Sequence, residues 1–169
     1  MNALTARNPL DTLRLLAGST LLVTGAVGAY AVALGNSTEL HVVAIASVSK
    51  VFRRAAGASD VVVRGDDVAI RVRQSFEKGV DAVIDTAIMV NEVAPAVRDN
   101  GTIITLRPVI EENLDRGVSA KFVNVRERVT DHATIKTLGQ QVASGLLALR
   151  VAATYPATEV VAAHRIFIR

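Results

Sequence analysis

The sequence contains no cysteine and few aromatic residues, and both shortages limit what the protein can be. Without cysteine the chain has no disulfide bridge and no thiolate-bound metal. The three histidines, at positions 41, 132 and 164, are too scattered to give a metal-ligand spacing, so we expect no metal site. Only 4% of the residues are aromatic whereas 50% are hydrophobic, which predicts a core built from Val, Ala, Leu and Ile.

The chain also lacks a strongly basic segment. Its formal net charge is +3, and Arg53-Arg54 is its only adjacent pair of basic residues. No basic run is interleaved with aromatic side chains, as it would be on a surface that binds nucleic acid. We therefore expect no nucleic-acid partner.

Charge is absent altogether from Leu15 to Thr38, a segment long enough to span a bilayer. Glycines at positions 18, 25, 28 and 35, together with several Ser, Thr and Asn residues, divide this segment into short apolar pieces. We expect a buried strand, turn and helix here, with a membrane anchor as the alternative. The expected location of the protein is accordingly the cytoplasm.

Predicted strands and helices alternate along the chain, joined by short links that contain glycine. Its length suits one domain spanning residues 1–169. We expect strands at 21–23, 40–46, 61–63, 80–85, 101–106 and 118–125, a short one at 149–153, and helices at 4–16 (interrupted near Pro9), 27–34, 48–56, 66–75, 90–98, 131–143 and 156–167. Such alternation predicts an α/β fold with a doubly wound, mostly parallel, Rossmann-like sheet.

The most informative stretch is the first strand and the turn that follows it. The apolar residues 21–23 end at Thr24-Gly25, and a second apolar segment begins at Val27-Gly28. A tight glycine turn between a strand and a helix leaves backbone N–H groups at the positive end of the helix, where a phosphate binds well. Residues Gly25, Ala26, Val27 and Gly28 are therefore predicted to bind a nucleotide cofactor.

The end of the second predicted strand indicates which dinucleotide would bind. An NAD site needs an Asp or Glu there to accept a hydrogen bond from the ribose 2′-hydroxyl. This chain instead has Ser47 and Lys50, which suit a 2′-phosphate and so favour NADP(H) over NAD(H). The alternative is that Lys50, Arg53 and Arg54 form only the solvated face of a helix.

Many short segments together resemble a known family. They include AGSTLLVTG at 17–25, HVVAIAS at 41–47, GASDVVV at 57–63, GVDAVIDT at 79–86, DNGTIITL at 99–106, GVSAKFVNV at 117–125 and EVVAAHRIF at 159–167. In this order and spacing they resemble the cofactor domain of the medium-chain dehydrogenase/reductase superfamily. The most similar branch is the zinc-free, alcohol dehydrogenase-like group of NADPH-dependent quinone oxidoreductases.

The resemblance implies roles for particular residues. Gly25 and Gly28 would lie in the pyrophosphate turn, and Ser47 and Lys50 would hold the 2′-phosphate. Arg64 stands where relatives often have a Tyr near that phosphate. The resemblance further places Thr86 in the cofactor cleft, and Phe122 and Val123 near the nicotinamide.

The sequence departs from the family pattern in three ways. Its turn is shorter than the G-A-x-G-x-V-G of relatives and lacks the middle glycine. No segment corresponds to the β-rich catalytic domain, and the last predicted helix is not followed by the usual strand. We therefore expect a sheet that is incomplete at its C-terminal edge.

No residue stands out as catalytic. Tyr30 is expected in the core or the cleft wall, His41 in a local hydrogen bond, and His132 and His164 at the surface. Asp85, at the end of a predicted strand, is expected to orient the next loop.

The family resemblance implies hydride transfer between NADPH and a carbonyl, enone or quinone. A small-molecule substrate is expected, and a homodimer is left open. The alternative is a non-catalytic, truncated nucleotide-binding module.

Overall fold

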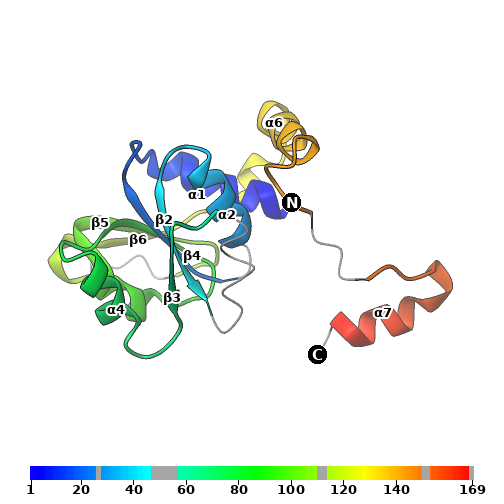
Figure 1. Cartoon of the computed structure of the whole chain (residues 1–169). Coiled ribbons are helices and arrows are strands. Elements are labelled where there is room, and N and C mark those ends of the chain that lie inside the picture. Colours follow the sequence, from blue (N-terminus) through cyan, green and yellow to red (C-terminus); the bar gives the residue numbers. More distant parts are fainter. Residues whose placement is uncertain (26–27, 47–56, 110–113, 150–152, 168–169) are drawn as a thin grey trace.

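A computed structural model describes residues 1–25, 28–46, 57–109, 114–149 and 153–167. Within these ranges, six strands form one sheet in the order β3-β2-β1-β4-β5-β6, and every neighbouring pair is parallel (Figure 1). The strands are β1 (Thr20–Val23), β2 (His41–Ala46), β3 (Asp60–Val63), β4 (Val80–Asp85), β5 (Val97–Thr105) and β6 (Ser119–Phe122). This order confirms the predicted doubly wound α/β fold.

Helices cover both faces of the sheet. The α-helices are α1 (Asn2–Leu13), α2 (Gly28–Asn36), α4 (Val68–Ser75), α5 (Val90–Val93), α6 (His132–Ala143) and α7 (Val160–Phe167). Short 3-10 turns are η1 (Ala94–Ala96), η2 (Asp115–Gly117), η3 (Val125–Arg128) and η4 (Ala157–Glu159). Helices α1 and α2 pack on one face, with α6 against α1, and α4 and α5 pack on the other face (Figure 1).

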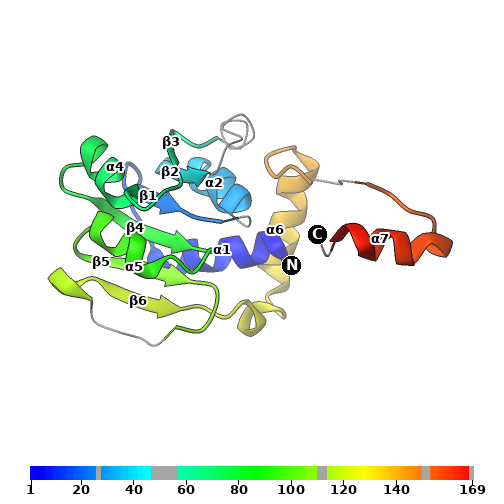
Figure 2. The ribbon, with the colours of Figure 1, turned by 90° about the horizontal axis from the view of Figure 1, so that it is seen from below.

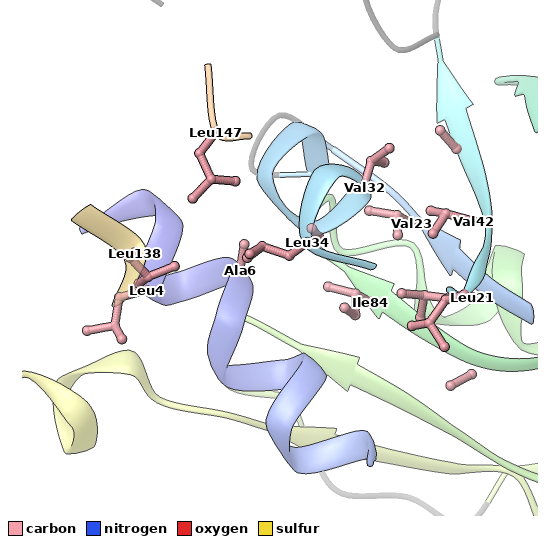
Figure 3. Close-up of a cluster of buried hydrophobic side chains, with 14 residues drawn as sticks. Leu4, Ala6, Leu21, Val23, Val32, Leu34, Val42, Ile84, Leu138 and Leu147 are labelled. Carbon is pink, nitrogen blue, oxygen red and sulfur yellow. The ribbon is translucent and has the colours of Figure 1, made fainter. Parts of the chain in front are cut away.

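The core is divided between the two faces according to the alternation of side chains along each strand. Leu21 and Val23 belong to the cluster beneath α1 and α2, whereas Leu22 belongs to the cluster beneath α4 and α5. Figure 3 shows Leu21, Val23 and Ile84 of the sheet facing Val32 and Leu34 of α2, with Ala6 of α1, Leu4, Leu138 and Leu147 beside them. Because the central strands are buried on both faces, they are mostly apolar on both faces, and the charged residues of β4 are Asp81 and Asp85.

Several elements differ from the sequence prediction. The strand predicted at 118–125 ends at Phe122, and the helix predicted at 156–167 is α-helical only from Val160. Helix α1 runs through Pro9 without interruption. The helix predicted at 90–98 ends at Val93 and continues only as η1, because Pro95 has no N–H to donate to an α-helical hydrogen bond. Strand β5 therefore begins at Val97, four residues before the predicted start at position 101. The predicted helix at 48–56 lies outside the described residues, as does most of the predicted strand at 149–153.

The junction between η1 and β5 is held by two arginines from other elements. Arg73 of α4 donates to the carbonyl oxygens of Pro95 and Val97 at 3.0 and 2.8 Å. Arg116 of η2 donates to the carbonyls of Ala94 and Val97 at 3.0 and 2.8 Å. These guanidinium groups therefore tie α4 and η2 to the junction between η1 and β5.

Helix α7 lies apart from the sheet in two views related by a rotation (Figures 1 and 2). Its Val160 and Val161 side chains are 53% and 62% exposed. These two apolar side chains are therefore not covered by the described part of the chain. Among the described helices, none is long and apolar enough to cross a membrane.

An ion-pair network joins α1 to the start of α6. Arg128 of η3 lies 2.5 Å from Asp11 and 2.6 Å from Asp131, and Arg7 pairs with Asp11 at 2.7 Å. Asp131 also caps α6 by accepting a hydrogen bond from the Thr134 backbone N–H. The hydrogen bond from Arg128, followed by that from Thr134, lowers the pKa of Asp131 from 3.8 to about 2. Burial raises the pKa of Asp11, but hydrogen bonds from Arg7 and Arg128 outweigh burial and lower it overall.

The Asp131 cap gives the first testable prediction. Because its folded-state pKa is below the unfolded value, the unfolded chain binds more protons between about pH 3.8 and 2. The stability that Asp131 contributes is therefore complete above this window and is lost as the pH falls through it. An NMR titration of the Thr134 amide should show a midpoint near 2 in the native chain, and Arg128→Met should move it towards 3.8.

Asp131→Asn is the matched control, because asparagine also caps helices but does not titrate in this range. A midpoint of 3.8 in the unmodified chain would contradict the assigned hydrogen bonds.

Candidate cofactor site

The strand order reverses between β1 and β4, which are neighbours in the sheet. Helix α2, which follows β1, covers one face, and α5, which follows β4, covers the other. In open α/β sheets a crevice forms outside the carboxyl ends of the strands at such a reversal, and ligands bind there. The predicted glycine turn follows the carboxyl end of β1 and therefore lies at this point.

The turn begins with a residue that must be glycine. Gly25 has a φ of +75°, in the region that favours glycine. A Cβ atom on Gly25 would lie 2.0 Å from the Thr86 Oγ1 atom and 2.9 Å from the Thr86 carbonyl carbon. The backbone after β1 thus approaches the loop after β4 too closely for any side chain. Gly28 is buried and begins α2, while the predicted residues Ala26 and Val27 lie outside the described residues.

Three polar side chains join the carboxyl ends of β1 and β4. The Thr24 hydroxyl donates to Asp85 Oδ1 at 2.6 Å and accepts from the Thr86 backbone N–H at 3.0 Å. The Thr86 hydroxyl donates to the Thr24 carbonyl oxygen at 2.6 Å. We call this set the Thr24–Asp85–Thr86 cluster. Thr86 is thus beside the glycine turn, where its hydroxyl hydrogen is used within the protein.

Asp85 has the loop-orienting role that its position predicts. Its carboxylate accepts hydrogen bonds from the backbone N–H groups of Ala87 at 3.0 Å and Met89 at 2.6 Å. The side chain is therefore committed to the loop after β4 as well as to Thr24. The sequence analysis assigns no role to Thr24. A threonine between an apolar strand and a glycine could nevertheless have indicated a buried hydroxyl at the end of the strand.

The residues predicted to hold the 2′-phosphate of NADP(H) follow β2 and β3 in the sequence. Ser47 and Lys50, with Arg53 and Arg54, lie outside the described residues. Arg64 directly follows β3 and is exposed, and its backbone N–H donates to the carbonyl of Ala46, the last residue of β2. Arg64 therefore lies at the same sheet edge as the glycine turn, beside the end of β2.

Phe122 and Val123 lie on the other side of the turn along this edge. Phe122 is the last residue of β6, and the Val123 N–H donates to the Thr105 carbonyl at 3.0 Å. Both residues are half-buried. The described part of the predicted site is thus spread along the carboxyl edge from β3 to β6.

The histidines do not join this site. His41 begins β2 and pairs with Asp60 at the start of β3, at 2.7 Å, so this pair lies at the opposite edge of the sheet. His132 and His164 are exposed, as predicted.

A hollow of about 540 Å³ lies over α1, α2 and α6. Its lining is mostly apolar and includes Leu4, Tyr30, Leu138 and Val142. Among the described residues that are predicted to bind the cofactor, none lines this hollow. The crevice expected at the reversal of the strand order lies instead at the carboxyl edge of the sheet.

The fold and the turn define a Rossmann-like α/β protein with the features of a dinucleotide site. The zinc-binding dehydrogenase family matches residues 56–167, and the chain belongs to this family. This match confirms the resemblance to the medium-chain dehydrogenase/reductase superfamily. A comparison with curated proteins finds no match.

Several solved structures share the fold. The enoyl reductase CurK is 23% identical with a TM-score of 0.81, over 99% of this chain and 57% of that one. The mycobacterial quinone oxidoreductase Rv154c is 21% identical with a TM-score of 0.85, over 99% and 58% of the two chains. Mycobacterial Rv1454c, solved in complex with NADPH, is 22% identical with a TM-score of 0.82, over 98% and 58%. The chain therefore spans somewhat more than half the length of these proteins.

The family is described by zinc binding, but the donor groups of this chain do not fit a zinc site. The sequence has no cysteine, and the described ranges contain no group of three or more His, Asp or Glu residues placed to hold a metal.

The close approach at Gly25 gives the second testable prediction. Gly25→Ala should lower the free energy of unfolding by more than about 1 kcal/mol, because it adds both a strained φ and a clash with Thr86. Gly145→Ala is the matched control, since Gly145 has a φ of +81° but no atom within 4 Å of its added Cβ. Urea unfolding of both variants measures the free energy of unfolding that each substitution removes, and the difference between them reports the clash. Equal losses of this free energy in the two variants would contradict the contact between Gly25 and Thr86.

Proposed function

We propose that this chain is the cofactor-binding part of an NADPH-dependent oxidoreductase of the quinone reductase or alcohol dehydrogenase-like type. The reaction is hydride transfer between the nicotinamide and a carbonyl, enone or quinone. The observation that carries the proposal is the glycine turn at the point where the strand order reverses, in a chain that belongs to a dehydrogenase family.

The proposed cofactor lies along the carboxyl edge of the sheet. The contact between Gly25 and Thr86 leaves the turn without a side chain at the point where a pyrophosphate would approach the backbone. The proposed cofactor-binding residues are Gly25, Ala26, Val27 and Gly28 for the pyrophosphate, Ser47, Lys50 and Arg64 for the 2′-phosphate, Thr86 in the cleft, and Phe122 and Val123 near the nicotinamide.

The bound nicotinamide would supply the hydride, and the residues of this chain would bind and orient it. Lys50 would contribute a charge-assisted hydrogen bond to the 2′-phosphate, and the glycine turn would contribute backbone N–H groups. We propose no catalytic residue. We further propose that residues 1–169 form one domain acting in the cytoplasm on a small-molecule substrate, with a homodimer as the candidate assembly.

A second candidate function is a non-catalytic nucleotide-binding module. It is favoured by the short turn, in which only two residues separate Gly25 from Gly28. Turnover of a quinone with NADPH by the purified chain would eliminate this candidate.

Cofactor selection gives the third testable prediction. Lys50→Ala should weaken NADPH binding roughly ten- to a hundredfold, because a hydrogen bond to a charged group contributes about 1.5–3 kcal/mol. NADH, which has no 2′-phosphate, should bind the variant and the unmodified chain equally. Titration of both cofactors by calorimetry measures this difference.

Lys136→Ala, on α6, is the control for a lost surface charge and should bind NADPH normally. A folded native chain that binds NADH as tightly as NADPH would contradict the proposed selectivity, and a folded chain that binds neither would contradict the proposed function.

A further inference from the structure

We propose that the Thr24–Asp85–Thr86 cluster is the positioning unit of the cofactor turn, with Asp85 as its buried anchor. The inference rests on the proposed function for the identity of the ligand. It goes further by assigning the shape of the turn to polar side chains from two strands. Asp85 and Thr24 are thus positioning residues rather than groups that touch the cofactor.

The cluster is a closed set of hydrogen bonds between segments far apart in the sequence. Thr24 Oγ1 donates to Asp85 Oδ1, the Thr86 N–H donates to Thr24 Oγ1, and Thr86 Oγ1 donates to the Thr24 carbonyl. The Thr24 N–H also donates to the Ile84 carbonyl at 3.0 Å. The N–H, carbonyl and hydroxyl of Thr24 are therefore all held by residues of β4 or the loop that follows it.

Burial makes these bonds important for the turn. Thr24 is 0% exposed and Asp85 is 2% exposed, so water does not replace a lost partner readily. A buried polar group without a partner is costly, and a network of satisfied groups holds one geometry. The cluster therefore favours a single arrangement of the Thr24–Gly25 peptide.

Asp85 determines the direction of the hydrogen bonds. Its carboxylate can only accept, and it accepts from the Thr24 hydroxyl and from the N–H groups of Ala87 and Met89. The Thr24 hydroxyl hydrogen is therefore committed to Asp85, which leaves the hydroxyl oxygen to accept from the Thr86 N–H. An amide in place of the carboxylate would direct an NH₂ group at one or two of these three donors, depending on which oxygen it replaces.

The cluster acts on the turn through Thr86. The Thr86 hydroxyl donates to the Thr24 carbonyl oxygen at 2.6 Å. The same Oγ1 atom would lie only 2.0 Å from a Cβ atom added to Gly25. The Thr86 Oγ1 atom thus fixes the plane of the Thr24–Gly25 peptide. It also lies so near Gly25 that only glycine fits at this position. Because a peptide group is planar, fixing its carbonyl also fixes the position of the Gly25 nitrogen and the direction of its bond to the Gly25 Cα atom.

The test compares Thr24→Val, which removes the hydroxyl, with Thr24→Ser, which retains it. Thr24→Val should weaken NADPH binding about tenfold or more, whereas Thr24→Ser should bind within about twofold of the native chain. Asp85→Asn should weaken binding as Thr24→Val does. Calorimetric titration with NADPH gives the affinities, and thermal unfolding gives the stability of each variant.

Leu138→Ala controls for a general loss of stability. Leu138 is buried between α6 and α1, and its truncation should lower the unfolding temperature without changing NADPH affinity. If Leu138→Ala weakens NADPH binding as much as Thr24→Val does, the positioning role of the cluster is overturned. It is also overturned if Thr24→Ser binds NADPH as weakly as Thr24→Val.

Amide hydrogen exchange provides a readout that does not need NADPH. The Thr86 amide, which donates to Thr24 Oγ1, should exchange faster in Thr24→Val than in Thr24→Ser, while amides in the centre of β2 stay unchanged. If the folded native chain binds no NADPH, the proposed function fails, and this exchange pattern alone decides whether the cluster holds the turn. Equal exchange at Thr86 in both variants would overturn the inference.

Discussion

The turn between β1 and α2 depends on the hydrogen-bonded contact between the carboxyl ends of β1 and β4. These strands are adjacent because the strand order reverses between them, and their chains leave the sheet towards opposite faces. The buried Thr24 hydroxyl and Asp85 carboxylate connect the two departing chains at 2.6 Å. Gly25 then occupies a space into which no side chain fits. The remainder of the fold keeps this edge in place by burying β1 and β4 on both faces of the sheet.

Much of this arrangement is predictable from the sequence because parallel, doubly buried strands leave a plain apolar signal. Residues 80–85 are both predicted and observed as a strand, and the carboxylate that ends it orients the next loop as expected. The boundary at Pro95 is predicted less well. The α-helix ends at Val93, two residues before Pro95, and Arg73 of α4 and Arg116 of η2 bind carbonyl oxygens at the junction that follows. These two contacts come from residues far away in the sequence, so the pattern around Pro95 does not reveal them.

The candidate site is predictable from the sequence only in outline. The glycines mark a turn, but the residue that fixes its geometry is Thr24, whose partners are about sixty positions away in the sequence. Single-sequence patterns describe neighbours within an element and do not report such a contact. The contact of Thr86 is hidden from the sequence in the same way, because its hydroxyl donates its hydrogen to the Thr24 carbonyl at the end of β1.

The central claim is that NADPH binds at the carboxyl edge of the sheet around the turn after β1. Amide chemical-shift mapping during an NADPH titration tests this claim most directly. The account predicts saturable shifts concentrated at Gly25, Gly28, Thr86 and Arg64, with little change around the hollow lined by Leu138 and Val142. Shifts concentrated at that hollow, or no shifts in the folded chain, would contradict it.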